Sequence, residues 1–240
     1  WKEAELLKYV QETAPKGNLD AVLRAVEDFA KKVQWLKVLG GTKARLLKSS
    51  LRPGDKVLEF GTYVGYSSLL LMQQLRLLGG GGRVTSCDQD AAVVLVAQKL
   101  LRWAAPGQDE VSLLVGRAQD LLQQCEFGDI HLLVLDHQGA SYVADLAAAL
   151  PWLQPGARVF ADNVLHPGAP LFIQALYQAT VASLDVAVHE VLEFSHTPAI
   201  ADWVVLAQLY SRRHGRLADA LCLEHPVELA PELSTVQLRR

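Results

Sequence analysis

The sequence has 240 residues, 50% of them hydrophobic, so one α/β domain with a sizeable core is expected. The formal net charge is -3, with Lys and Arg scattered, which argues against nucleic acid or an anionic membrane as a partner. The cysteines Cys87, Cys125 and Cys222 lack metal-type spacing, which argues against a disulfide framework and structural zinc. No run reaches the length of a membrane span, so a cytoplasmic protein is expected. The chain begins at Trp1 rather than Met, which leaves an upstream anchor or targeting segment open.

The first part of the chain is predicted to be helical. Amphipathic patterns cover 2–14, 20–38 and 42–51, and the turn RPGD follows at 52–55. From residue 56 onward, strand-like and helix-like segments alternate. The predicted strands are 56–60, 83–88, 110–116, 130–136, 157–163, 184–194 and 202–210. We expect one domain over 1–211, made of a helical cap at 1–51 and a core at 52–211, followed by a peripheral tail at 212–240.

This alternation predicts a doubly wound α/β fold, in which a mostly parallel sheet is covered by helices on both faces. The last two predicted strands are joined by the short loop 195–201, which suits an antiparallel hairpin at the sheet edge. Ligands of such sheets bind beyond the carboxyl ends of the strands, near the point where the strand order reverses. Acidic residues at or near these ends therefore predict a polar ligand: Glu59, Asp88, Asp136, Asp162 and Glu193.

The turn EFGTYVGYS after the first strand of the core carries two glycines, which let a backbone approach a ligand closely. Its spacing is not GxGxxG and no Walker lysine is present, so a dinucleotide or triphosphate is disfavoured; an ordinary βα turn is the alternative. Asp88 follows Gly61 by 27 residues, a placement that suits the two hydroxyls of a ribose. Asp90 is a second candidate, or the cap of the next helix. The pattern indicates a nucleoside ligand without a phosphate tail.

Two further groups of polar residues follow later strands. Gln119 and Asp120 either contact a base edge or begin a helix. Asp136, Asp162 and Asn163 end two strands that are neighbours in a doubly wound sheet. Carboxylate and amide oxygens suit Mg²⁺ or Ca²⁺ rather than zinc. The alternative is that Asp162 and Asn163 only cap the following loop.

The segments VLEFGTYVGYS, VGRAQD, VLDH and FADNVLHPGAPLF, taken together in this order and spacing, resemble catechol O-methyltransferase. The similarity runs from about residue 3 to residue 210. It implies a class I, Rossmann-like methyltransferase that uses S-adenosylmethionine and Mg²⁺ to methylate a small catechol or related phenol.

The resemblance also implies a role for each matching residue. The cofactor would be bound by Val38, Glu59, Gly61, Tyr63, Ser67, Asp88, Ala118, Gln119, Asp136 and His137. The magnesium ligands would be Asp136, Asp162 and Asn163, and Glu193 would hold the second hydroxyl of the acceptor. The acceptor pocket would include Trp35, Lys37, Gln138, Pro167 and Glu193. His131, His189 and His196 fall at no matching functional position and are expected at the surface or on an edge strand.

One departure from the family concerns the catalytic base. The catechol enzymes carry Trp and then Lys after the Asp–His pair, whereas this chain has Gln138 and Gly139. Candidate substitutes are His166, His137 and Lys37. His166 is favoured because it follows the metal ligands and because histidine is a common general base; an exposed loop histidine is its alternative. We therefore predict His166, His137 and Glu193 as the catalytic set.

The missing lysine leaves two predicted functions. The first is an S-adenosylmethionine- and Mg²⁺-dependent O-methyltransferase that acts on a small phenol or catechol. The second is a catalytically weakened S-adenosylmethionine-binding protein with a binding or scaffold role. The sequence leaves the oligomeric state open.

Overall fold

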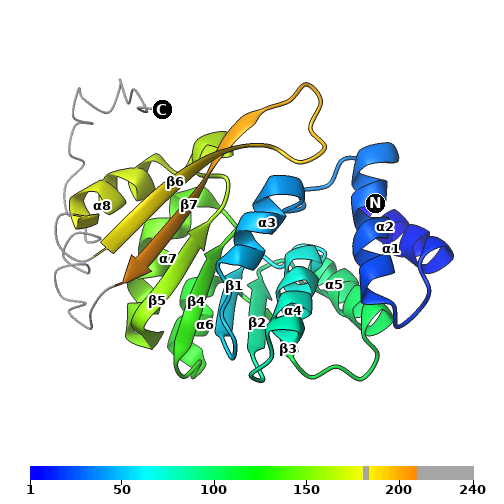
Figure 1. Cartoon of the computed structure of the whole chain (residues 1–240), viewed down its shortest axis with the longest axis horizontal. Coiled ribbons are helices and arrows are strands. Elements are labelled where there is room, and N and C mark those ends of the chain that lie inside the picture. Colours follow the sequence, from blue (N-terminus) through cyan, green and yellow to red (C-terminus); the bar gives the residue numbers. More distant parts are fainter. Residues whose placement is uncertain (181–183, 210–240) are drawn as a thin grey trace.

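A computed structural model describes residues 1–180 and 184–209 (Figure 1). Its sheet has seven strands in the order β3-β2-β1-β4-β5-β7-β6. The strands are β1 (Lys56–Phe60), β2 (Arg83–Asp88), β3 (Val111–Val115), β4 (Ile130–Leu135), β5 (Leu153–Ala161), β6 (Leu184–Leu192) and β7 (Ala201–Leu209). The first five strands run parallel, while β7 pairs antiparallel with both β5 and β6. The predicted doubly wound sheet with an antiparallel edge hairpin is confirmed.

Helices cover both faces of the sheet and enclose two hydrophobic cores (Figure 1). One core involves α1 (Lys2–Thr13), α2 (Leu19–Lys32), α3 (Gly41–Ser49), α4 (Tyr66–Leu78) and α5 (Ala91–Ala104). The other involves α6 (Ala118–Gln124), α7 (Tyr142–Ala149) and α8 (Pro170–Thr180). Short turns η1 (Gly139–Ser141), η2 (Leu150–Trp152) and η3 (Val164–Gly168) connect these elements. The first three helices therefore share a core with α4 and α5, and the predicted boundary between cap and core stays a prediction.

The helix predicted over 20–38 is too long. In the structure α2 ends at Lys32, and the residues up to Gly40 form a loop. Leu36 and Val38 are buried in this loop. Because the loop conformation buries these two side chains, tertiary packing overrides the helical pattern of the sequence here. The loop consequently passes along the carboxyl edge of the sheet and contributes to the pocket described below.

The loop between β6 and β7 packs against this segment. A Cβ added to Gly40 would lie 2.5 Å from the ring of Phe194, so only glycine allows this approach. Lys31 lies over the same ring, at 4.7 Å from its centroid. The loop after α2 and the edge hairpin thus form one continuous wall.

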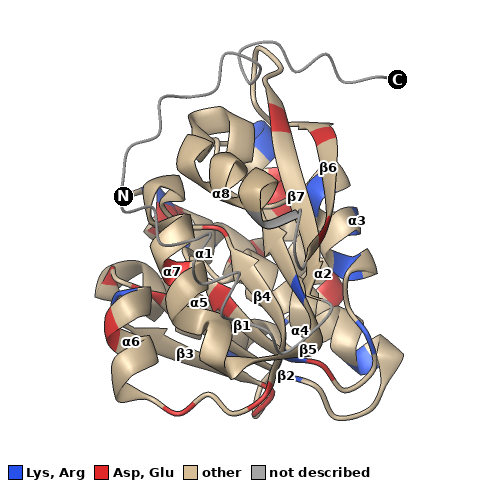
Figure 2. Ribbon diagram, turned by 90° about the vertical axis from the view of Figure 1, so that its left-hand side faces the viewer, with Lys and Arg blue, Asp and Glu red and all other residues tan. Residues whose placement is uncertain are grey.

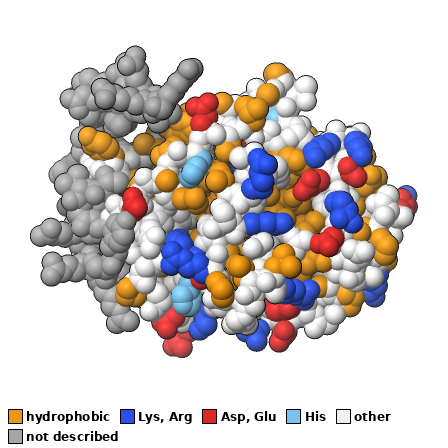
Figure 3. All heavy atoms as spheres, in the orientation of Figure 1, with side chains coloured by type: hydrophobic (Ala, Val, Ile, Leu, Met, Phe, Trp, Pro, Cys, Tyr) orange, Lys and Arg blue, Asp and Glu red, His pale blue; other side chains and the backbone are white. Residues whose placement is uncertain are grey.

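Charged residues are spread over most elements (Figure 2). On the face shown in Figure 3, Lys and Arg side chains lie among acidic and hydrophobic ones. Among the described residues, no helix is both long and apolar enough to cross a bilayer. Cys222 and the predicted tail at 212–240 lie outside the described residues.

Candidate functional site

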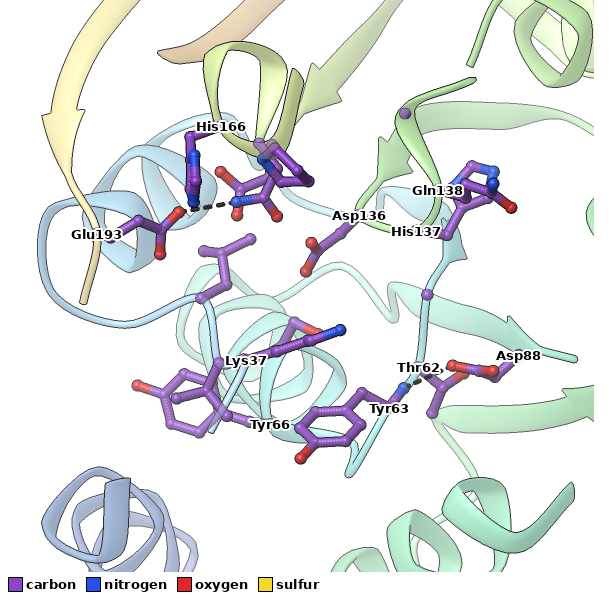
Figure 4. Close-up of a pocket in the computed structure, with 18 of the residues that line it drawn as sticks. Lys37, Thr62, Tyr63, Tyr66, Asp88, Asp136, His137, Gln138, His166 and Glu193 are labelled. Atoms are coloured by element: carbon purple, nitrogen blue, oxygen red, sulfur yellow. Dashed lines mark hydrogen bonds between the residues drawn. The ribbon is translucent and has the colours of Figure 1, made fainter. Parts of the chain in front are cut away.

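A cavity of about 750 Å³ opens at the carboxyl edge of the sheet (Figure 4). It lies where the strand order reverses, between β1 and β4. Its walls come from the loop after α2, the ends of β1, β2, β4 and β5, the η3 turn and the β6–β7 loop. The sequence predicts ligand binding at this edge of the sheet, and the cavity lies at the same edge.

The turn after β1 fixes the floor of the cavity. Gly61 has a φ of 108°, and an added Cβ would lie 2.1 Å from the carbonyl oxygen of Asp136. A side chain at residue 61 would therefore push apart the ends of β1 and β4. Tyr63 also has a positive φ of 46°, and its backbone N–H donates to Oδ2 of Asp88 at 2.9 Å. Ser67, on the first turn of α4, lines the cavity as well.

Asp88 and Asp90 have different roles in the structure. Asp88 lines the cavity, and its Oδ1 accepts from the backbone N–H of Asp90 at 3.0 Å. Asp90 caps α5, with its Oδ1 accepting from the N–H of Ala92 at 2.8 Å. The structure thus separates the two acids that the sequence left as alternatives. Asp88 is the one in position for a ligand.

Glu59 lies beneath the cavity rather than in its lining. It is fully buried, and Oε2 accepts from the hydroxyl of Ser68. Burial raises the pKa of Glu59, which the hydroxyls of Ser68, Ser86 and Ser67 partly offset. Oε1 is buried without a hydrogen-bond partner among the described residues. Direct contact between Glu59 and a cofactor therefore stays a prediction.

The residues predicted at the adenine do not line the cavity. Ala118 is buried in the second core, and Gln119 is exposed. Both belong to the first turn of α6, as in the alternative that Gln119 begins a helix. Their contact with a base stays a prediction.

His137 faces away from the acidic side of the cavity (Figure 4). Its Nε2 lies 2.6 Å from Oδ2 of Asp145, and its ring packs near those of Phe60 and Tyr142. Nδ1 is buried without a partner among the described residues. Asp145 thus holds the ring away from the acidic side of the cavity, a position less suited to taking a proton from an acceptor beside Glu193.

The predicted metal ligands lie in a larger charged cluster, which we call the acid cluster: Asp136, Asp162, Asn163, Glu193, Asp202 and Lys43. Asn163 has a positive φ of 55°, and its Nδ2 donates to Oε1 of Glu193 at 2.8 Å and to Oδ2 of Asp202 at 3.2 Å. Because two carboxylates hold the amide nitrogen, the amide oxygen is the atom of Asn163 left for a cation. Lys43, which is 1% exposed, forms ion pairs with Asp162, Glu193 and Asp202.

The acid cluster fits a bound cation in its charge. Burial, and next the charge of Asp162, raise the pKa of Asp136 well above its ordinary value. Burial also raises the pKa of Asp162 to about 6, although Lys43 opposes this shift. These carboxylates are poorly solvated, and a hard divalent cation beside them would favour their charged form. Within the described residues no three His, Cys, Asp or Glu side chains converge as a metal site, and the predicted ligand set of Asp136, Asp162 and Asn163 stays a prediction.

The side of the cavity that contains Trp35 and Pro167 is also lined by polar residues. Trp35 and Pro167 line it, together with Lys37, Gln138 and His166. Figure 4 shows Lys37 extending across the cavity between Asp136 and Tyr63, and His166 beside Glu193. No hydrogen bond or ion pair joins the Lys37 ammonium to another described residue. This ammonium is therefore available to a ligand.

The residues that were not predicted for the site include His196, Lys43 and Asp202. His196 was expected at the surface or on an edge strand, and it lies partly exposed in the β6–β7 loop. It also lines the cavity, with its ring packed edge-on to Trp35 at 5.5 Å, because this loop packs against the loop after α2. Lys43 and Asp202 were also missed. Lys43 lies in a helical pattern that gives no sign of a buried charge. Asp202 is the second residue of β7, an interior strand between β5 and β6, and the strand pattern gives no sign of a functional acid there.

A model of the methyltransferase domain family matches residues 58–164 of the chain. The chain is 31% identical to the catechol O-methyltransferase of Mus musculus over 180 residues, which cover 72% of this chain and 66% of the mouse protein. It is 34% identical over 184 residues to a probable O-methyltransferase of Mycobacterium tuberculosis, covering 71% of this chain and 76% of that protein. The chain belongs to the catechol O-methyltransferase family.

Solved structures of O-methyltransferases share the fold of this family member. The O-methyltransferase TomG from Streptomyces achromogenes, solved in complex with S-adenosylmethionine, has a TM-score of 0.65 and 20% identity. The match covers 79% of this chain and 90% of TomG. The chain spans 60–66% of the length of the first curated family members that it matches.

Proposed function

We propose that the chain transfers the methyl group of S-adenosylmethionine to a hydroxyl oxygen of a small phenol, with a catechol as the favoured acceptor. The acceptor oxygen bonds to the methyl carbon while the carbon–sulfur bond breaks, and its electron pair stays on sulfur. The products are the methyl ether, S-adenosylhomocysteine and a proton. One observation carries the proposal: a single cavity is lined both by Asp88, which is predicted to hold a ribose, and by Asp136, Asp162, Asn163 and Glu193 of the acid cluster.

The cofactor would lie along the turn after β1. Asp88 would accept from the ribose hydroxyls while its position is fixed by the backbone N–H groups of Tyr63 and Asp90. Gly61 leaves room for the cofactor backbone, and Ser67 and Val38 border the methionine end. In-line transfer requires that the acceptor oxygen be held close to the methyl group and opposite the sulfur.

The acceptor would lie between the acid cluster and the Trp35–Pro167 wall. A magnesium ion held by Asp136, Asp162 and Asn163 would favour the ionised form of a phenol and orient it. Glu193 would accept a hydrogen bond from the neighbouring hydroxyl. Because Asn163 and Lys43 both donate to Oε1 of Glu193, its Oε2 is the oxygen left for that contact.

Proton removal is assigned to His166, whose ring borders the cavity beside Glu193 (Figure 4). Its backbone N–H donates to Oδ1 of Asp202 at 2.7 Å, which fixes the backbone on which the ring is carried. Lys37 also reaches the cavity, whereas His137 is held on the cofactor side by Asp145. A positioned base commonly contributes about 10²–10⁴-fold to the rate.

The absence of a side chain at Gly139 favours a second candidate function. Without the lysine that the family uses, the chain would bind S-adenosylmethionine as a binding or scaffold protein and turn over slowly. Asp88 and the turn after β1 do not depend on the residue at 139, so cofactor binding is common to both functions.

Titration calorimetry with S-adenosylmethionine tests the shared part of the two functions. Incubation with labelled cofactor and either dihydroxybenzoate or dopamine then separates them. Methyl transfer that requires Mg²⁺ and stops in chelator supports the first function. Cofactor binding without transfer supports the second, and no binding contradicts both. Full activity in chelator contradicts the metal role alone.

A further inference from the structure

Lys43 places a positive charge inside the acid cluster. Its ammonium lies 2.8 Å from Oδ1 of Asp162 and 2.7 Å from Oδ2 of Asp202, and it also contacts Glu193. Burial alone would lower the pKa of Lys43, but the carboxylates, Asp162 first, raise it above its ordinary value. The side chain is therefore a cation at neutral pH, and it is carried on the first turn of α3.

One ammonium does not neutralise this cluster. Asp136, Asp162, Glu193 and Asp202 supply four carboxylates, and Lys43 contacts three of them. Asp136 lines the cavity, and the ion pairs of Lys43 are with the other three carboxylates. The cluster thus attracts a further cation, but any such cation meets the charge of Lys43 at the same carboxylates.

We infer that Lys43 competes with the divalent cation for the acid cluster and so sets a low metal affinity. The inference rests on the proposed function, because it concerns the proposed metal site. Asp162 is the shared group, a predicted metal ligand that already forms an ion pair with Lys43. The Lys43 ammonium and a divalent cation bound to the same carboxylate repel each other. Water screens this repulsion only weakly in a buried site.

The positions of the ligands do not depend on Lys43 alone. Asn163 holds Glu193 and Asp202 through its own amide nitrogen. Asp202 also accepts from the backbone N–H groups of Leu165 and His166, at 3.1 and 2.7 Å. Removing the ammonium therefore changes the charge of the cluster more than its geometry, and metal affinity should rise.

Three variants separate charge from position. Lys43→Met removes the ammonium. Lys43→Met with Asp202→Asn removes the ammonium and one carboxylate, which returns the cluster to its original charge. Lys48→Met is the matched control, because it removes the same charge from the same helix, where Lys48 bonds only to Gln73 among the described residues. The double variant also provides a protein with fewer unpaired buried carboxylates if Lys43→Met folds poorly.

Binding of Mn²⁺, measured by the electron paramagnetic resonance of the free ion, is the readout, and calorimetry with S-adenosylmethionine confirms that each variant is folded. We expect Lys43→Met to bind Mn²⁺ about tenfold or more tightly than the wild type. The double variant should return to within roughly threefold of the wild type, and Lys48→Met should match it.

Equal or weaker Mn²⁺ binding by Lys43→Met, with the wild type binding normally, would overturn the inference and leave the proposed function standing. If Lys43→Met does not bind S-adenosylmethionine, the double variant decides: affinity more than about tenfold below the wild type would show that Lys43 only positions the ligands. If no protein binds Mn²⁺ while all bind S-adenosylmethionine, the metal role in the proposed function is wrong, and the inference with it.

Discussion

Gly139 packs directly against the backbone of Gly168. A Cβ at residue 139 would lie 2.6 Å from the carbonyl oxygen of Gly168 and 3.1 Å from the Cβ of Ala169. The position at which related catechol enzymes carry a lysine is therefore closed to any side chain, because a backbone oxygen cannot move aside as a flexible side chain would. The packing of η1 against η3 therefore leaves no room for a lysine side chain at residue 139.

The first prediction follows from this contact. Gly139→Lys should not restore a catalytic base; it should destabilise the protein by about 1–3 kcal/mol, since the added atoms overpack a closed site. Gln138→Lys is the control, because residue 138 already carries an exposed side chain at the cavity. Urea unfolding and methyl transfer are measured for both. Higher turnover in Gly139→Lys at unchanged stability would show that the contact is easily relieved.

The second prediction concerns the ribose. Asp88→Ala should weaken S-adenosylmethionine binding about ten- to hundredfold, because hydrogen bonds to a charged acceptor contribute about 1.5–3 kcal/mol. Asp90→Ala should leave this affinity unchanged and cost about 1 kcal/mol of stability, since it removes the cap of α5. Calorimetry and thermal unfolding separate the two effects. Comparable affinity losses in both variants would contradict the assignment.

The third prediction separates the metal from the cofactor. Asp162→Ala should abolish Mn²⁺ binding and methyl transfer while the affinity for S-adenosylmethionine changes by less than about threefold, because Asp162 is assigned to the metal and not to the cofactor. Calorimetry with the cofactor and resonance measurements with Mn²⁺ are made on one preparation. A parallel loss of both affinities would mean that the sites are wrongly assigned.

The fourth prediction uses the buried carboxyl of Glu59. Its pKa lies above its ordinary value of 4.5 because of burial. The folded state therefore holds this proton more tightly than the unfolded state, and the wild type loses stability as pH rises through the folded-state pKa. Glu59→Gln cannot ionise, so it should be more stable than the wild type at about pH 7 and show no advantage at about pH 4.

Urea unfolding at both pH values measures this difference. If Glu59→Gln is less stable than the wild type at neutral pH, the prediction is wrong. Groups other than the serine hydroxyls would then stabilise the charged carboxylate. Calorimetry on the same variant reports whether Glu59 reaches the cofactor, which the buried position alone does not require.

The fifth prediction concerns the charge of the acceptor. Lys37 extends into the cavity as an ammonium without an ion-pair partner among the described residues, so it should favour an acceptor that carries a carboxylate. Lys37→Met should lower kcat/KM for dihydroxybenzoate roughly two- to fivefold relative to dopamine, a size expected of an exposed charge pair. Equal effects on the two acceptors would remove Lys37 from substrate selection.

The sequence by itself determined the architecture and the edge at which the site lies. Alternating strand and helix patterns, together with the short loop before β7, predict a doubly wound sheet with an antiparallel edge. The acids Asp88, Asp136 and Asp162 follow strands whose carboxyl ends must meet, so their convergence is a consequence of strand direction. A resemblance spread over several motifs then identified the family.

Only the tertiary structure decided which side chains complete the site. Lys43 enters the acid cluster because α3 packs over the sheet beside β6 and β7, a relation between segments more than 100 residues apart in the chain. Glu59 lies beneath the cavity because Ser68 binds it there, and His196 lines the cavity because its loop meets Trp35. Local sequence patterns record which face of an element is apolar, but they do not record which distant partner that face will meet.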